Sequence, residues 1–333
     1  MSEEKQNQSQ LNSKEFVPWV EKYRPKKLSD VIGQPQIVLR LESYLKTGNF
    51  PHLLLAGRPG TGKTSAVLAL AHQLYGSDIR ECFKELNASD SRGIDTIRGQ
   101  VKDFARTMPL TNVNFKILLL DEADALTDEA QQALRRTMEA YSANTRFVLS
   151  ANYSSKIIEP IQSRCAVFRF RPFSDEDIKK IILRVIEGEG LSLDDPAINA
   201  LVYVADGDAR RAINALQGAA TTTKKISEQD ILSVASRARP EEVVKMLDLA
   251  FEGKFSLARG QLDSLLINYS MSGPDIISQI YRTVVKMQIP DEKKVLIVDK
   301  IGEYDYRMVE GADPRIQLEA LLAQISLSAK KTA

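Results

Sequence analysis

Eight residues in the first fifth of the chain have the types and spacing to hold a polyphosphate. They follow an apolar run at 52–56, precede a helix-like stretch at 65–74, and read Gly57, Arg58, Pro59, Gly60, Thr61, Gly62, Lys63 and Thr64. Glycines let backbone N–H groups face phosphate oxygens closely, and the following helix adds the positive end of its dipole. In the GxxxxGKT spacing, the lysine reaches the β- and γ-phosphates and the threonine hydroxyl is offered to Mg²⁺. A glycine-rich turn that binds nothing is the alternative, and the flanking strand and helix argue against it.

A pair of carboxylates follows a second apolar run, at 116–120. Asp121 and Glu122 come directly after this run, with Asp124 two residues on. Carboxylates at the end of a buried strand are costly unless they face a cation or a cleft. In an open parallel sheet, the carboxyl ends of the strands line the ligand crevice, so Asp121 can hold Mg²⁺ and Glu122 can orient or deprotonate a water. The pair therefore predicts hydrolysis of a bound nucleotide. The alternative is an acidic first turn of a helix, and Asp124 partly fits it.

The elements that must position these motifs alternate between strand and helix. Five short candidate strands, at 52–56, 83–87, 116–120, 146–150 and 166–170, are separated by helical patterns. This alternation predicts an α/β fold in which helices cover both faces of a parallel sheet. Ser174 begins a helix that continues through 178–187, and no convincing strand follows it. Beyond Pro240 the apolar spacing is helical throughout.

The length, charge and composition of the chain limit the class of protein. Its 333 residues allow two or three domains, and a net charge of +1 predicts no global attraction to nucleic acid or membrane. With two cysteines and two histidines, neither a disulfide framework nor a metal site built from cysteine and histidine is expected. No apolar run approaches a membrane span, and the polar residues 1–14 lack the apolar core of a signal peptide, so we expect a disordered tail on an intracellular protein.

Further motifs give the sequence a specific resemblance. It contains EKYRP at 21–25, NASDSRGID at 87–95, SANY at 150–153, SRC at 163–165 and GDARRAIN at 207–214. With the glycine loop and the acidic pair in this order, the chain resembles the AAA+ class and, within it, the small subunits of replication factor C, most closely archaeal ones. The match covers about 16–220. The resemblance implies a tail at 1–15, an AAA+ P-loop ATPase core with a five-stranded parallel sheet at 16–171, a helical lid at 172–236 and an all-α collar at 237–333.

The resemblance also implies roles for residues whose patterns are weak alone. Asn152 would touch the γ-phosphate and the attacking water, although a turn-forming asparagine is an equally good reading of the residue itself. Arg164 would act as an arginine finger on the ATP of a neighbouring subunit, and Arg210 would contact the γ-phosphate from the lid. For both arginines the alternative is an exposed basic side chain. The N-terminal segment 17–34 would wrap the adenine, with Val31 and Ile32 as its apolar walls, or else these two residues belong to the core.

Contacts with DNA depend most on the resemblance. A helix expected at 94–106 places Ile94, Ile97, Val101, Phe104 and Ala105 on one face and Arg98, Lys102 and Arg106 on the other. Its mixed charge fits a solvated helix. In the family, residues matching Arg92, Arg98 and Lys156 follow the DNA backbone, which suits sequence-independent loading.

The implied function is ATP-dependent loading of a ring-shaped sliding clamp onto primer–template DNA, with ATP and Mg²⁺ at the site. The implied partners are a large subunit, other small subunits and a clamp of the PCNA type. The cytoplasm of an archaeon is expected, or the nucleus if the source is eukaryotic. Two alternatives stay open, a DNA helicase such as a branch-migration motor and an assembly subunit that binds ATP without hydrolysing it.

Overall fold

The computed structural model describes residues 17–90, 95, 97–108, 113–221, 223–235, 237–269 and 271–330. The chain divides into two compact units, one formed by 1–193 with 201–220 and the other by 194–200 with 221–333. Helix α11 (Asp195–Ala205) contributes residues to both units. In the part of the chain that the structure describes, no helix is long and apolar enough to cross a membrane.

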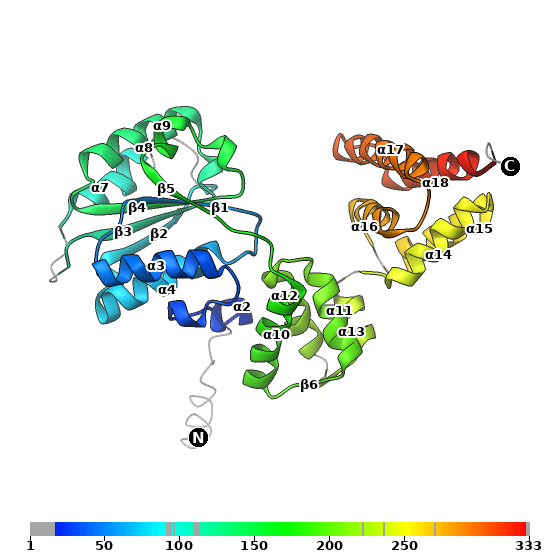
Figure 1. Cartoon of the computed structure of the whole chain (residues 1–333), viewed down its shortest axis with the longest axis horizontal. Coiled ribbons are helices and arrows are strands. Elements are labelled where there is room, and N and C mark those ends of the chain that lie inside the picture. Colours follow the sequence, from blue (N-terminus) through cyan, green and yellow to red (C-terminus); the bar gives the residue numbers. More distant parts are fainter. Residues whose placement is uncertain are drawn as a thin grey trace, which may run out of the picture. The chain divides into compact units, whose positions relative to one another are not determined.

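The first unit is built on a five-stranded parallel sheet, as the sequence predicts. Its spatial order is β2-β3-β4-β1-β5, shown in Figure 1. The strands are β1 (His52–Ala56), β2 (Phe83–Asn87), β3 (Lys116–Asp121), β4 (Thr145–Ala151) and β5 (Cys165–Arg169). Each lies within one residue of its predicted bounds. The order places β4 between β1, which leads into the glycine loop, and β3, which ends in the carboxylates.

Helices cover both faces of this sheet (Figure 1). On one face lie α3 (Pro35–Thr47) and α4 (Lys63–Tyr75), and on the other lie α7 (Lys102–Arg106), α8 (Asp128–Ala140) and α9 (Glu159–Gln162). Each face of the sheet has its own hydrophobic core. Alternate residues of each strand pack into one or the other, because successive side chains of a strand point to opposite faces. Leu53 and Leu55 pack with α4 on one side, while Leu54 packs with residues of α8 on the other.

The remaining elements of the first unit connect these layers or follow the sheet. Short elements are α2 (Trp19–Lys22), η1 (Leu28–Asp30), η2 (Gly76–Asp78), α5 (Ile79–Cys82), η3 (Ile97–Val101), η4 (Ala123–Ala125) and η5 (Ser154–Lys156). After the sheet come α10 (Asp175–Glu189), β6 (Ser192–Leu193) and α12 (Ala209–Ala220). We call α10 and α12 the lid helices. Ser174 caps α10 by accepting a hydrogen bond from the Asp177 N–H, which confirms the predicted start.

The helix expected at 94–106 differs from its prediction in the residues that are described. Ile97–Val101 is a π-helical segment, η3, and the α-helix α7 begins only at Lys102. Val101 and Ala105 are buried as predicted. A π turn adds a residue to the helical repeat, so the stripes expected from a regular 3.6-residue period do not continue unbroken through this segment.

Where it is described, the second unit is helical apart from one short strand, β7 (Lys225–Ile226). Its helices are α13 (Glu228–Val234), α14 (Pro240–Phe251), α15 (Phe255–Ile267), α16 (Gly273–Lys286), α17 (Asp291–Val309) and α18 (Pro314–Lys330). The apolar residues predicted from helical spacing, such as Val243, Leu247, Leu318 and Leu322, meet in one core. The expectation of no strand after 187 was wrong for β6 and β7, since two-residue strands are too short to show a period.

Candidate active site

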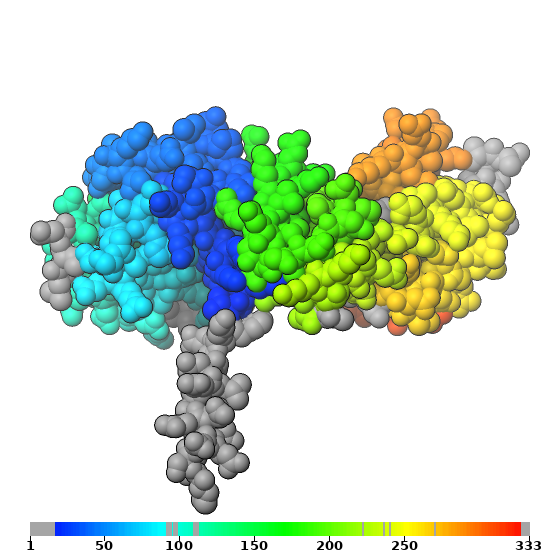
Figure 2. Space-filling model, turned by 90° about the horizontal axis from the view of Figure 1, so that it is seen from below, coloured from blue at the N-terminus to red at the C-terminus, as the bar shows by residue number. Residues whose placement is uncertain are grey.

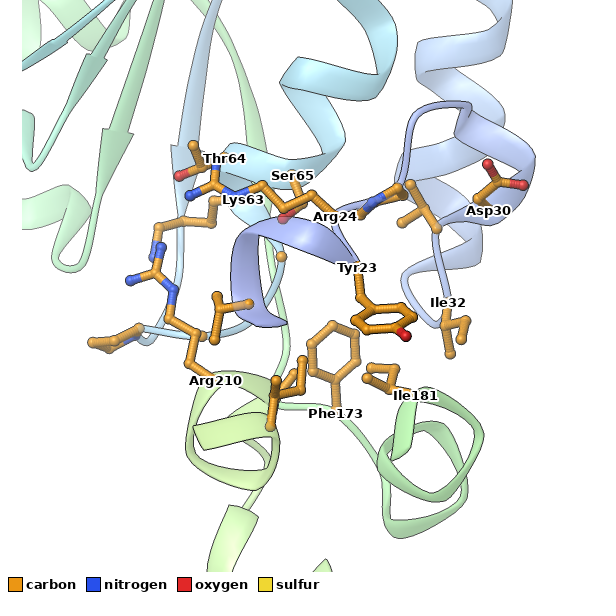
Figure 3. Close-up of a pocket in the computed structure, with 18 of the residues that line it drawn as sticks. Tyr23, Arg24, Asp30, Ile32, Lys63, Thr64, Ser65, Phe173, Ile181 and Arg210 are labelled. Atoms are coloured by element: carbon orange, nitrogen blue, oxygen red, sulfur yellow. The ribbon is translucent and has the colours of Figure 1, made fainter. Parts of the chain in front are cut away.

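A pocket opens at the carboxyl edge of the sheet and is lined by the glycine loop, the N-terminal segment and the lid helices. Figure 3 shows Lys63 and Thr64 on one side of it, Tyr23 and Ile32 on another, and Phe173, Ile181 and Arg210 on the side of the lid. Lys63 and Thr64 therefore lie at one end of the pocket and most of the apolar side chains at the other, where Figure 3 also shows Asp30 near Ile32. This division suits a nucleotide, whose phosphates and base need opposite surroundings.

The glycine loop joins β1 to α4 as the sequence predicts. Gly62, with φ 90°, is the N-cap of α4, a left-handed conformation that glycine adopts without strain. Thr61 closes the loop by donating a hydrogen bond to the Arg58 carbonyl at 2.8 Å. Arg58 and Pro59 are exposed, and Pro59 lines the pocket. The N-terminus of α4 thus faces the pocket with its positive dipole, which is the arrangement that binds phosphate.

Lys63 lies at the centre of the polar end. It is only 7% exposed, and its Nζ donates to the carbonyls of Gly57 and Arg58 at 2.7 and 3.0 Å and to Asn152 Oδ1 at 3.3 Å. Burial lowers the pKa of the Lys63 ammonium below its usual range, an effect opposed chiefly by the charge of Asp121. A buried cation surrounded by oxygen acceptors is suited to receive phosphate oxygens.

The two motifs meet through Thr64 and Asp121. The Thr64 hydroxyl donates to Asp121 Oδ2 at 2.8 Å, and the other oxygen of Asp121 accepts the Glu122 N–H at 3.0 Å. Glu122 has φ 52° and ψ 38°, a left-handed conformation that is strained for a residue with a side chain. Its carboxylate is exposed and lines the pocket. Strain of this kind is typically retained where it aims a functional group.

Asn152 ends β4 and lies between the two motifs, as the strand order requires. Its amide oxygen accepts the hydrogen bond from Lys63 described above, and the residue lines the pocket with Asp121 and Glu122. The next residue, Tyr153, donates its backbone N–H to Asp124 Oδ2 at 3.2 Å. The structure thus places Asn152 beside both the glycine loop and the acidic pair. An asparagine that served only to form a turn would not need this position.

The apolar end of the pocket includes Val31 and Ile32, both predicted, and several side chains that were not. The latter come from the N-terminal segment and the lid and are Val20, Tyr23, Pro25, Phe173, Ile181, Val185 and Ile213. Pattern alone could not separate the lid residues from an ordinary helical core. The EKYRP motif pointed to the segment that holds Tyr23, but not to that side chain.

Hydrogen bonds tie the N-terminal segment to the lid helices. The Trp19 N–H donates to Gln217 Oε1 at 3.0 Å, and the Tyr23 hydroxyl donates to Glu189 at 2.9 Å. Figure 2 shows this segment, in blue, against the lid, in green. The N-terminal segment and the lid thus meet at the pocket although they are far apart in sequence, with 198 positions between Trp19 and Gln217.

The lid also contacts the glycine loop directly. The Ala209 N–H donates to the Gly60 carbonyl at 3.2 Å, and Asp208 caps α12 by accepting from the Arg210 N–H at 2.8 Å. Figure 3 shows the Arg210 side chain extending from the lid towards Lys63. A Cβ on Gly60 would lie 1.6 Å from Asp208 Oδ1, so this contact needs glycine. Arg210 is thus placed by the same contact that fixes the lid to the loop.

Arg164 does not line this pocket. It precedes β5, whose first residue, Cys165, pairs with His52 at the start of β1. β1 has five residues, so at about 3.3 Å each the amino and carboxyl edges of the sheet are about 16 Å apart. The structure therefore brings Arg164 to the edge opposite its own glycine loop, where it is exposed.

Of the three predicted DNA contacts, only Lys156 can be placed with its side chain. It is exposed in η5, and its Nζ lies 5.5 Å from the centre of the Tyr153 ring. Arg92 lies outside the described residues. Arg98 lies in the described backbone of η3, but its side chain is outside the description.

Comparison with known proteins agrees with this geometry. Residues 53–173 match the family described as "ATPase family associated with various cellular activities (AAA)", and residues 238–324 match the "Replication factor C C-terminal domain". A replication factor C small subunit from Methanocella arvoryzae is 56% identical over 93% of this chain and 96% of its own. Another, from Archaeoglobus fulgidus, is 52% identical over 95% of this chain and 99% of its own.

A solved structure of the Thermotoga maritima RuvB Holliday junction branch migration motor resembles the fold. Its TM-score is 0.53 at 18% identity, covering 77% of this chain and 91% of that one. At this identity the likeness establishes the shared AAA+ architecture alone. The two archaeal relatives, in contrast, are 56% and 52% identical over nearly the full chain. By this identity the chain belongs to the family of replication factor C small subunits.

Proposed function

We propose that this chain is the ATP-hydrolysing small subunit of a clamp loader, which places a ring-shaped sliding clamp on primer–template DNA. One observation carries the proposal. In a chain 56% identical to a replication factor C small subunit, a pocket lined by Lys63, Asp121, Glu122, Asn152 and Arg210 lies at one edge of the sheet. The remaining predicted catalytic residue, Arg164, lies at the other edge and cannot reach it. Such a subunit can complete catalysis only with a neighbour.

The polar end of the pocket fits ATP phosphates and Mg²⁺. Thr64 and Asp121 supply a hydroxyl and a carboxylate oxygen 2.8 Å apart, the ligand type that Mg²⁺ prefers. No cluster of three histidine, cysteine or acidic side chains arranged for a metal occurs among the described residues, so phosphate and water would complete the coordination. When bound, Mg²⁺ neutralises charge that develops on the phosphate oxygens.

Each of the residues that line the pocket then has its own role in the reaction. Lys63 binds the β- and γ-phosphates, Glu122 takes a proton from the attacking water, and Asn152 orients that water against the γ-phosphate. Arg210 contacts the γ-phosphate from the lid, so that lid closure depends on ATP. The support for these roles is their convergence on one pocket. The apolar end, with Val31 and Ile32, takes the adenine.

Arg164 acts on the ATP of the neighbouring subunit. Arginine suits this role because its planar guanidinium can bind two phosphate oxygens at once. An arginine supplied in this way accelerates phosphoryl transfer by about 10³–10⁵-fold in other ATP- and GTP-hydrolysing proteins. The position of Arg164 at the far edge of the sheet supports action in trans.

The rest of the chain serves assembly and DNA. We propose a core at 16–171, a lid at 172–236 and a collar at 237–333, whose helices hold subunits together. Its partners would be a large subunit, further small subunits and a clamp of the PCNA type. Arg92, Arg98 and Lys156 would follow the phosphates of primer–template DNA. The archaeal sources of the relatives support action in an archaeal cytoplasm.

An ATPase assay tests this function. ATP turnover by the assembled complex is measured alone, with clamp, with primed DNA and with both. A clamp loader should turn over fastest when both are present. Turnover driven by branched DNA without a clamp would instead identify a motor, and binding without turnover would identify an assembly switch.

A further inference from the structure

The guanidinium of Arg164 is held by groups from two helices. Its Nη1 donates to the Pro160 carbonyl in α9 at 2.6 Å, and its Nη2 forms an ion pair with Glu139 Oε1 in the last turn of α8, also at 2.6 Å. The same Glu139 oxygen lies 3.9 Å from Arg135 Nη1, so Arg164 is the nearer partner. Two acceptors in fixed elements thus define the orientation of a long, exposed side chain.

These contacts leave part of the Arg164 guanidinium available to bind phosphate oxygens. A guanidinium has five N–H donors. Nη1 also donates a longer hydrogen bond, of 3.4 Å, to Ser163 Oγ, so these contacts engage two donors of Nη1 and one of Nη2. The Arg164 and Glu139 side chains are 37% and 42% exposed, and an ion pair so exposed contributes little to stability. It can therefore restrict the rotamers of Arg164 without competing strongly with a triphosphate. A side chain ordered beforehand loses less conformational entropy when it meets its target.

We propose that Glu139 is a positioning residue for Arg164, holding the guanidinium extended towards the ATP of the neighbouring subunit. The inference rests on the action of Arg164 in trans proposed above. Glu139 touches neither nucleotide nor water, so it acts only through Arg164. Its loss should lower kcat and leave the KM for ATP unchanged, because each subunit's own nucleotide pocket is intact.

The test is ATP turnover by the complex assembled with its large subunit, clamp and primed DNA. Glu139→Ala should lower kcat about two- to fivefold, the range that an exposed ion pair supports. Glu139→Gln, which keeps an oxygen acceptor, should lose less. Arg164→Ala should lose far more, and Glu139→Ala added to it should change nothing further. Glu129→Ala, which removes an exposed glutamate from the first turn of the same helix, is the matched control and should leave turnover unchanged.

Each other outcome overturns the proposal in a recognisable way. A rise in kcat for Glu139→Ala would mean that the ion pair restrains Arg164. No change would mean a surface contact without function, and a further loss in the Arg164→Ala background would mean that Glu139 acts elsewhere. If Arg164→Ala itself leaves turnover intact, the action of Arg164 in trans fails as well. Sedimentation confirms that every variant assembles.

Discussion

Thr64 Oγ1 donates a 2.8 Å hydrogen bond to Asp121 Oδ2 and so joins the helix after the glycine loop to the end of β3. The two residues are 57 positions apart in sequence, and the parallel sheet is what brings them together. Both groups are side-chain oxygens at the carboxyl edge, beside the buried ammonium of Lys63. The binding and hydrolysis of ATP proposed above would therefore use one site, and its parts can be removed separately.

Lys63→Ala and Glu122→Gln should separate binding from turnover. Lys63→Ala removes charged hydrogen bonds to phosphate, each worth about 1.5–3 kcal/mol, so ATP affinity should fall about tenfold or more. Glu122→Gln keeps the shape but loses the base, so affinity should persist while kcat falls by about 10²–10⁴. Titration with a fluorescent ATP analogue and steady-state turnover measure the two effects. Wild-type turnover by Glu122→Gln would refute the assignment of the base.

Gly60→Ala should weaken nucleotide binding by disturbing the lid. The added Cβ would lie 1.6 Å from Asp208 Oδ1 and must displace the cap of α12, which costs about 1 kcal/mol. Affinity should fall about fivefold or more. Gly48→Ala is the matched control, because Gly48 has a similar φ of 62° but nothing within 4 Å of the added Cβ. Equal losses of affinity in the two variants would show that backbone strain, not the lid contact, is responsible.

His52 should make the first unit sensitive to acid. It is 8% exposed and accepts the Phe147 N–H at Nδ1, and burial, aided by the charge of Arg146, lowers its pKa from 6.5 to about 4. The folded state then binds fewer protons than the unfolded state between these values. Stability should therefore fall as the pH falls from about 6.5 to about 4, by about 2–3 kcal/mol at pH 4.5.

Urea unfolding at pH 7 and pH 4.5 measures this effect, with the fluorescence of Trp19, the single tryptophan of the chain, reporting on the first unit. His52→Gln should lose less stability between the two pH values than the wild type. His72→Gln, at the exposed second histidine, should behave as the wild type does. An identical pH dependence in His52→Gln and the wild type would rule out this contribution.

Removing the charges of Arg92, Arg98 and Lys156 should weaken DNA binding evenly across sequences. Each lost phosphate contact should reduce the slope of log K against log salt by about 0.9 for duplex DNA. ATP binding should survive. Lys245→Ala, an exposed lysine of the second unit, serves as control. A triple variant with an unchanged salt slope would show that these side chains are solvated surface.

Sequence patterns were sufficient to predict the five strands of the sheet and the strands that the two motifs follow. The strands other than β2, which contains Lys84 and Glu85, are mainly apolar runs between polar segments, so their bounds are local properties. The π turn of η3 and the strands β6 and β7 could not be predicted, because neither a single extra residue in a helix nor a two-residue strand leaves a periodic signal.

The polar end of the site was likewise predictable, since few functions explain Lys63, Thr64, Asp121 and Glu122 together. The apolar end was not. Phe173 and Ile181 lie on elements far from the glycine loop in sequence, and their apolar character fits a core equally well. The ion pair of Arg164 with Glu139 was also invisible, because only the packing of α8 against α9 brings the two together.

Mixing two inactive variants tests most directly that catalysis is shared between subunits. Arg164→Ala subunits keep their own Glu122, and Glu122→Gln subunits keep their own Arg164. When the two are co-assembled, some interfaces combine an intact glutamate with an intact arginine from the neighbour. We predict that the mixture, shown by sedimentation to co-assemble, recovers part of the wild-type ATP turnover that neither variant has alone. Turnover no greater than that of the separate variants would contradict the account.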